Sequence, residues 1–262
     1  MDVKIRCNRI IHGKCQEVLT KFPNDCVDLV VTSPPYDNLR DYHTEDSWND
    51  EAFHNLAKQL HRVIKPGGVL VWNVNDQTIN GSETGTSFYQ ALYFMYTGFL
   101  LNDTMIWYKS NPIPQVKQLR YSQCFEYMFV FSKGKPKTFN PIMIPTQAGK
   151  KVYKSSCKNG SNPEDRVIKT IHSSGWKIDN NIWQFPVAQN KTLYKHPAVF
   201  PYELPHRHIK TWTNEGDVVL DPFSGSGTTC LAAKNLNRKY IGIELNPMYL
   251  AHSILRLNKN MI

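Results

Sequence analysis

A loop with unusual chemistry follows a short apolar run near the amino terminus. Val27–Thr32 is rich in β-branched residues, and Ser33-Pro34-Pro35-Tyr36 ends it abruptly. The pattern predicts a buried strand that runs into a rigid loop. Proline has no N–H and a fixed φ, so the loop can present carbonyl and hydroxyl acceptors that orient an amine. Tyr36 offers a flat face on which a nucleobase can stack. For this motif alone, a plain Pro-Pro turn is the alternative.

A second motif lies near the other end of the sequence. Asp221-Pro222-Phe223-Ser224-Gly225-Ser226-Gly227-Thr228 follows an apolar run and precedes a helical pattern. A strand, a turn with two glycines and a helix are typical of nucleotide-binding folds, since the helix end offers free N–H groups. Glu244 ends the next expected strand, where a carboxylate can bind both ribose hydroxyls. Cys230 replaces a third glycine, which disfavours a pyrophosphate and favours an adenosine ligand such as S-adenosylmethionine. A glycine-rich turn in an α/β core is the alternative.

The elements that must position these motifs alternate along the chain. Apolar runs predict strands at 27–32, 69–74, 103–108, 125–131, 217–220 and 240–245. Steps of three and four between apolar residues predict helices at 51–64, 88–96, 230–237 and 247–257. Strands separated by helices of this length indicate an α/β fold, a doubly wound and mostly parallel sheet with helices on both faces.

The two motifs together resemble those of the β class of amino-methylating DNA methyltransferases, the N4-cytosine and N6-adenine enzymes of restriction–modification systems. That class has a Ser/Asp/Asn-Pro-Pro-Tyr motif near its amino end and an F-x-G-x-G motif near its carboxyl end, which is the order found here. The resemblance covers roughly residues 4–133 and 186–257. It implies a methyltransferase fold, S-adenosylmethionine as cofactor, and methyl transfer to the exocyclic amine of a base flipped out of duplex DNA.

The resemblance also implies roles for individual residues. The target base and its amine would be held by Ser33, Pro34, Pro35 and Tyr36. The cofactor would be bound by Asp221, Phe223, Gly225, Gly227, Thr228, Glu244, His196 and Pro197. In this set Phe223 packs on the adenine, Glu244 binds the ribose, and Asp221 steadies the loop and the methionine amino group. His196 and Pro197 open a helix that closes over the methionine moiety, and ordinary capping by a proline at a helix start is the alternative.

The choice of base depends on Ser33. The class tends to carry Ser-Pro-Pro-Tyr in N4-cytosine enzymes and Asp-Pro-Pro-Tyr in N6-adenine enzymes, so Ser33 favours cytosine N4. N6-adenine methylation is the alternative within the class. Outside the class, the rivals are a methyltransferase of RNA or of a protein amide, and a non-catalytic DNA-binding module. The basic insert and the motif order favour DNA, and the intact motifs favour catalysis.

A basic segment interrupts the α/β pattern. Residues 134–185 hold eight Lys and one Arg against three acidic residues, a net charge of +6 out of +9 for the whole chain. Helical periodicity is absent there. We therefore expect a small target-recognition insert at 134–185 in a methyltransferase domain made of 1–133 and 186–262. Its candidate phosphate contacts are Lys150, Lys151, Lys154 and Lys158. Trp176, Trp183 and Phe185 are expected to form a small core of the insert, and stacking on or wedging between bases is the alternative.

Composition limits the class of protein further. Among 262 residues, 31 Lys and Arg against 22 Asp and Glu favour a polyanionic partner. The longest apolar run, Phe88–Leu101, has 14 residues, too few for a membrane span of ~20. Six cysteines without a C-x-x-C pair indicate reduced thiols in a cytosolic protein, and no spacing predicts a metal. The resemblance implies a prokaryotic cytoplasm, at the nucleoid. The predicted partners are double-stranded DNA and, where one exists, a cognate restriction endonuclease. Monomer and homodimer both stay open.

Overall fold

The computed structural model describes residues 5–35, 48–112, 119–147, 149–158, 166–187 and 201–259. Contacts divide the chain into a larger unit, Met1–Asn140 with Asn181–Ile262, and a smaller unit, Pro141–Asn180. The smaller unit is narrower than the expected insert, because residues at both ends of that segment belong to the larger unit.

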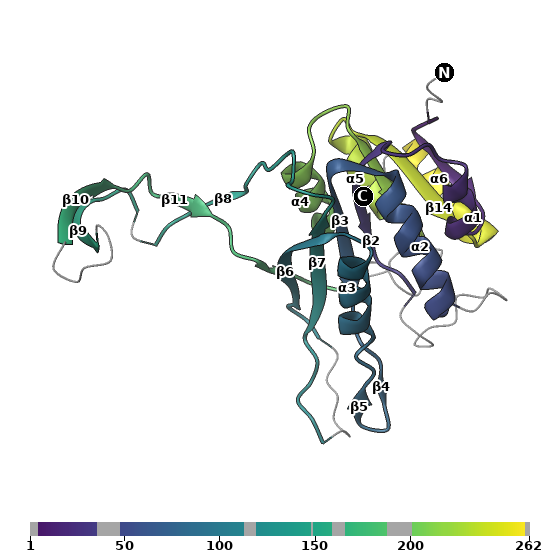
Figure 1. Ribbon diagram of the computed structural model, residues 1–262, viewed down its shortest axis with the longest axis horizontal. Helices are drawn as coiled ribbons and strands as arrows, with labels where there is room; N and C mark the ends of the chain where they lie inside the picture. Colours follow the sequence, from purple (N-terminus) through teal and green to yellow (C-terminus); the bar gives the residue numbers. More distant parts are fainter. Residues whose placement is uncertain are drawn as a thin grey trace. The chain divides into compact units, whose positions relative to one another are not determined.

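An eight-stranded sheet runs through the larger unit in the order β1-β14-β13-β2-β3-β7-β6-β12 (Figure 1). The strands are β1 (Arg9–His12), β2 (Val27–Thr32), β3 (Ile64–Val74), β6 (Leu100–Lys109), β7 (Phe125–Ser132), β12 (Ile182–Phe185), β13 (Val218–Asp221) and β14 (Lys239–Glu244). Neighbours from β1 to β3 are parallel, as are β6 and β12. Only β7 runs antiparallel to its neighbours β3 and β6. The predicted mostly parallel sheet is confirmed.

Helices cover both faces of this sheet (Figure 1). Those in the described residues are α1 (Cys15–Thr20), α2 (Asp50–Val63), α3 (Thr86–Tyr96), α4 (Glu203–Trp212), α5 (Thr228–Asn235) and α6 (Pro247–Lys259). Leu19, Leu56 and Phe94 bring α1, α2 and α3 into one apolar cluster with the sheet. Leu231 of α5 and Leu257 of α6 belong to a second cluster. Within the described part of the chain, no helix has the length and apolar character needed to cross a membrane.

The helix α2 shows how local sequence fixes an element. Asn49 caps its start, because the Asn49 side chain accepts a hydrogen bond of 2.9 Å from the N–H of Ala52. Phe53, Leu56 and Leu60 recur at helical spacing and are buried against the sheet. The prediction of a helix at 51–64 is therefore confirmed to within one residue at each end.

The strand β3 begins earlier than its apolar run. It starts at Ile64 and includes Pro66-Gly67-Gly68, which the sequence predicts only as a helix stop. The glycine backbone pairs with the end of β7, since the N–H of Gly67 donates to the Lys133 carbonyl at 2.6 Å. Pairing with the backbone of Lys133, which is distant in sequence, therefore extends β3 toward its amino end.

The last strand of the expected insert belongs to the main sheet. β12 pairs in parallel with β6, with Trp183 opposite Trp107 and Phe185 opposite Lys109. Trp183 is buried there, and its ring packs against His208 of α4 at 4.6 Å between centroids. The expectation that Trp176, Trp183 and Phe185 form a core of the insert is wrong, because Trp183 and Phe185 belong to the larger unit and Trp176 is exposed.

The described residues of the smaller unit form two antiparallel strand pairs. β8 (Met143–Pro145) pairs with β11 (Trp176–Ile178), and β9 (Val152–Lys158) pairs with β10 (Arg166–His172). A further short hairpin, β4 (Thr78–Ile79) and β5 (Ser82–Glu83), follows β3 in the larger unit.

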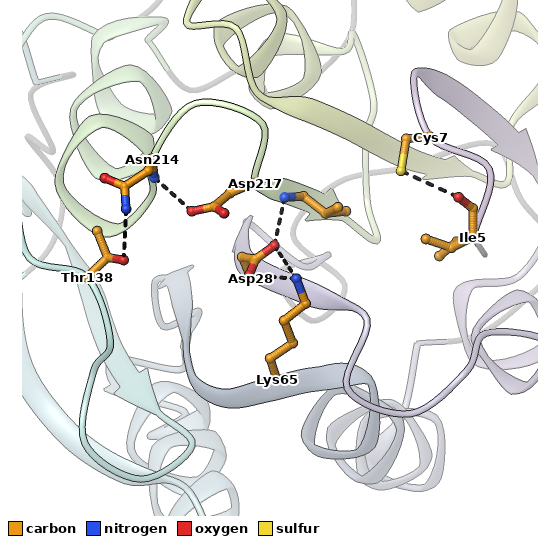
Figure 2. A network of polar contacts seen from close by, with 8 residues as sticks. Ile5, Cys7, Asp28, Lys65, Thr138, Asn214 and Asp217 are labelled. Atoms are coloured by element: carbon orange, nitrogen blue, oxygen red, sulfur yellow. Dashed lines mark hydrogen bonds and ion pairs between the residues drawn. The ribbon is translucent and has the colours of Figure 1, made fainter. Parts of the chain in front are cut away.

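Polar contacts fix the amino ends of three neighbouring strands (Figure 2). Asp28 of β2 accepts hydrogen bonds from the Lys65 ammonium at 2.7 Å and from the N–H of Val218 at 2.9 Å. Just before β13, the Asp217 carboxylate accepts from the N–H of Asn214 at 2.7 Å. These contacts hold β2, β3 and β13 in register. The register in turn fixes the positions of the carboxyl ends of these strands at the opposite edge of the sheet.

Candidate active site

The two sequence motifs meet at the carboxyl edge of the sheet. β2 and β13 are parallel neighbours, with Leu29 opposite Val219 and Val30 opposite Leu220. Because parallel strands end at the same edge, the loops that follow them leave the sheet side by side. The Ser-Pro-Pro loop and the glycine turn are therefore adjacent, although they lie at opposite ends of the sequence.

A buried hydrogen bond joins the two loops. The Thr32 hydroxyl donates to Asp221 Oδ1 at 2.7 Å, across 189 positions of sequence. The N–H of Phe223 donates to the same oxygen at 3.1 Å. Burial raises the pKa of Asp221 to about 6, although hydrogen bonds from Thr32, Thr229 and Phe223 act to lower it. Ionisation of Asp221 therefore costs free energy unless a cationic group lies beside it.

Glu244 organises the glycine turn from the next strand. Its Oε2 accepts the N–H of Gly225 at 2.7 Å, and its Oε1 accepts the N–H of Asn246 at 2.9 Å. Each carboxylate oxygen can accept a second hydrogen bond. The side chain is half-buried, and burial raises its pKa while hydrogen bonds from the backbone of Asn246, Gly225 and Leu245 oppose that rise. A carboxylate with spare acceptor capacity thus lies at the edge of the turn.

Gly227 serves the packing of the turn. It has φ of +77°, a conformation that favours glycine, and a Cβ there would lie 3.0 Å from Ser253 of α6. Thr228 is the first residue of α5 and is buried. Gly225 also has a positive φ of +48°. Gly227 therefore allows α6 to approach the turn closely.

The neighbouring strand provides the room that a third glycine would give. Cys230 occupies that position in α5, and its sulfur would lie 3.0 Å from a Cβ on Gly242 of β14. Ser224 Oγ would lie 2.6 Å from the same atom. Burial raises the pKa of the Cys230 thiol above its ordinary range. Cys230 is therefore a packing residue, which the spacing of glycines alone does not reveal.

Arg256 is a residue of this site that sequence reasoning missed. From α6 its Nη1 donates to Thr228 Oγ1 at 2.9 Å and to the carbonyl and hydroxyl oxygens of Ser226 at 3.2 and 3.3 Å. It holds the turn in place from about 30 residues further along the chain. The sequence around Arg256 does not predict this role, because arginine is common in the last turns of helices.

Aromatic rings surround Phe223 at the start of the turn. The Trp48 ring lies 5.1 Å away at 88°, and the Trp72 ring lies 6.4 Å away at 69°. Phe223 itself is half-buried, so part of its ring is accessible. Phe223 is predicted from its motif, whereas Trp48 is not, because only the fold brings it near.

The other selected residues fall in different places. Ser33 and Pro35 are half-buried and Pro34 is buried at the end of β2, whereas Tyr36, His196 and Pro197 lie outside the described residues. Lys150, Lys151 and Lys154 are exposed in the smaller unit, and Lys158 is the last residue of β9. Within the described ranges, no three His, Cys, Asp or Glu side chains gather as metal ligands would.

Comparison with known proteins identifies the family. Residues 27–255 match the model of the N6/N4 DNA methylase family, so this chain belongs to the amino-methylating DNA methyltransferases, which use S-adenosylmethionine. It is 47% identical over 234 residues to the orphan methyltransferase M.BamHII of Bacillus amyloliquefaciens, covering 86% of each chain. It is 30% identical to the DNA adenine methyltransferase YhdJ of Escherichia coli K12, covering 95% of this chain and 82% of YhdJ.

A solved structure shows the same fold. The cytosine-N4-specific PvuII DNA methyltransferase superposes with a TM-score of 0.71 at 23% identity, covering 99% of this chain and 89% of the other. The predicted α/β methyltransferase fold is therefore confirmed.

The raised pKa of Asp221 predicts a pH dependence of stability. An unfolded Asp titrates near pH ~4, whereas Asp221 titrates near 6, so between these values the folded chain holds a proton that the unfolded chain has lost. This contribution is fully present below pH ~4 and is lost as the pH rises through 6, by about 3 kcal/mol. Denaturant unfolding from pH 4 to 7 should show the loss in the wild type relative to Asp221→Asn. Parallel stability curves for the two proteins would refute it.

Proposed function

We propose that this DNA methyltransferase methylates the N4 amine of cytosine in duplex DNA, and that Ser33, Pro34, Pro35 and Tyr36 hold the flipped base. The observation that supports this is the position of Ser33, one residue beyond Thr32, whose hydroxyl is bonded to the first residue of the glycine turn. A base amine held at Ser33 and a cofactor held at the turn would then lie together at one point of the sheet edge.

The residues of the turn fit S-adenosylmethionine. The Glu244 carboxylate has about four acceptor sites, so the N–H groups of Gly225, Asn246 and Leu245 leave capacity for a ribose hydroxyl. Asp221 is a buried carboxylate that a ligand ammonium group would stabilise in its charged form. The accessible part of the Phe223 ring offers a surface for adenine. We assign the ribose to Glu244, the methionine amino group to Asp221 and the adenine to Phe223.

The remaining cofactor residues support this arrangement. Gly225 and Gly227 shape the turn, and Thr228 begins the helix whose N-terminus faces it. His196 and Pro197, outside the described residues, complete the proposed set by closing over the methionine moiety.

The main task of the protein in this reaction is to position the amine and the cofactor. S-adenosylmethionine, when bound, supplies a methyl group already activated on a sulfonium. Ser33 and the Pro34 carbonyl accept the N–H bonds of the amine and so orient its nitrogen, while Tyr36 stacks on the base. The buried surroundings of Pro34 and Asp221 exclude water from this point. Correct placement of this kind supplies most of the rate enhancement that we expect.

The serine supports cytosine over adenine. Ser33 offers a neutral hydroxyl where an N6-adenine enzyme tends to have a carboxylate. N6-adenine methylation is the second candidate, because the relative that is named as an adenine methyltransferase matches 95% of this chain.

Paired substitutions separate the two proposed halves of the site. Ser33→Ala should reduce methyl transfer by about 10²-fold, since the amine loses its orientation, while the Kd for S-adenosylmethionine stays the same. Glu244→Gln should weaken cofactor binding by roughly 10–100-fold through the loss of charge-assisted hydrogen bonds. Transfer is measured by mass spectrometry of nucleosides from treated DNA, and binding by calorimetry.

The nucleoside product also tests the base. N4-methylcytosine is the expected product on DNA of varied sequence. N6-methyladenine would keep the enzyme class and overturn the proposed base, and neither product would overturn the proposed activity. Unchanged transfer by Ser33→Ala would refute the role of the Ser-Pro-Pro-Tyr loop.

We further propose that the smaller unit binds the DNA target. Residues 149–158 and 166–178 contain seven Lys and Arg and no acidic residue. Lys150, Lys151 and Lys154 are exposed there, and β9 and β10 form a two-stranded ribbon. A ribbon of this kind fits the major groove of B-DNA.

Salt dependence tests this surface. Replacing Lys150, Lys151 and Lys154 by Ala should lower the slope of log Kd against log salt by about 3, roughly 1 for each phosphate that no longer has a lysine partner. The matched control replaces Lys21, Lys239 and Lys259, which are exposed in the larger unit, and should leave the slope unchanged. Equal slopes for the two triple variants would reject the smaller unit as the DNA-docking surface.

A further inference from the structure

Two connections leave the sheet at the edge that carries the candidate active site. β3 is the parallel neighbour of β2, and β7 runs antiparallel to both β3 and β6. β3 and β6 therefore end at the same edge as β2, where Ser33 and the glycine turn lie. The connection after β3 contains the hairpin β4–β5, which projects beyond the sheet (Figure 1). The connection from β6 to β7 is described at residues 110–112 and 119–124.

Local sequence specifies the hairpin β4–β5. Ile79 pairs with Ser82, so the two strands are joined by a loop of two residues, Asn80 and Gly81. Both have a positive φ, +51° and +84°, as the tight turns of two-residue hairpins require. At the base of the hairpin, the Asp76 carboxylate accepts the N–H and the hydroxyl of Ser87 at 2.8 and 2.6 Å. The hairpin is therefore anchored to the start of α3.

Hydrogen bonds attach the end of the β6–β7 connection to this hairpin. The Arg120 guanidinium donates to Thr78 Oγ1 at 2.6 Å and forms an ion pair with Glu83. Gln123 Nε2 donates to Asn75 Oδ1 at 2.7 Å. Arg120 is half-buried by these contacts, and its charge is balanced by Glu83. Arg120 therefore fixes the chain around it to the projecting hairpin.

The residues on either side of Arg120 are held in solvent. Leu119 is fully exposed and Tyr121 is 98% exposed. Single exposed apolar residues are common on protein surfaces. Here, however, an anchored arginine holds two of them together at the edge where the target base must enter. Arg120 is the only Lys or Arg in residues 75–85 and 119–124, so this projection offers apolar and aromatic surface rather than ligands for phosphate.

We propose that Leu119 and Tyr121 enter the DNA duplex beside the target base and occupy the gap that the base leaves. This inference rests on the proposed function, in which a base reaches Ser33 only after it leaves the stack. Leaving the stack breaks pairing and stacking, and proteins that open base steps commonly insert apolar side chains between them. Leu119 fills part of the gap, and the Tyr121 ring stacks on a neighbouring base. Both are positioning residues, since they contact the DNA and not the reacting amine.

Two duplexes test this role on the full chain. The methylated position is first mapped by sequencing DNA treated with the wild type. It is then placed in one duplex with its normal partner base and in a second duplex with an abasic site opposite it. In the second duplex the target base is already unpaired, so its departure from the stack costs less.

The double variant Leu119→Ala with Tyr121→Ala should be defective on the paired duplex only. Its single-turnover methylation rate should fall by roughly 10–100-fold on the paired duplex, the range that one base–aromatic stack contributes. On the duplex with the abasic site, the rate should be within about 3-fold of the wild type. Both side chains are exposed, so the variant should keep its fold.

Two matched variants serve as controls. Tyr121→Phe keeps the ring and, like Leu255→Ala at an exposed leucine of α6, should keep the wild-type rate on both duplexes. A wild-type rate for the double variant on the paired duplex would overturn the inference and leave the proposed function standing. An equal loss on both duplexes would do the same, because the two side chains would then serve packing or another partner. A wild type that methylates no base would overturn the proposed function, and the inference with it.

Discussion

The site depends on the hydrogen bond between Thr32 and Asp221. It is buried, 2.7 Å long, and joins the last residue of β2 to the last residue of β13. Thr32 immediately precedes Ser33, and Asp221 accepts the N–H of Phe223 with the same oxygen. Because a buried carboxylate needs its donors, this bond fixes both loops together. The opposite ends of these strands are held by Asp28, so the register is set from both sides.

Much of the fold follows from local sequence. The apolar run at 27–32 and the helical spacing of 51–64 predict β2 and α2, because burial and capping act within a few residues. The sequence did not predict that β12 joins β6, since strand pairing is a contact between distant segments. The prediction that Trp183 and Phe185 belong to the insert is therefore wrong.

The candidate site also contains residues that the sequence predicts and residues that only the fold reveals. The loop types that follow strands identify Ser33, Asp221 and Glu244, because turn chemistry and strand ends are visible in sequence. Trp48 and Arg256 are not visible, since each reaches the glycine turn only through the packing of the folded chain. Family membership adds the cofactor and the substrate class. The base that we propose, cytosine, rests on the single residue Ser33.

The most direct test of this account is the effect of Thr32→Val on methylation and cofactor binding. Valine preserves the shape and β-branching of Thr32 and removes only the hydroxyl that donates to Asp221. The account predicts a fold that remains intact by circular dichroism, with both a slower single-turnover methylation rate and a weaker affinity for S-adenosylmethionine. If the folded variant keeps the wild-type rate and affinity, the two loops do not depend on this bond and the account is contradicted.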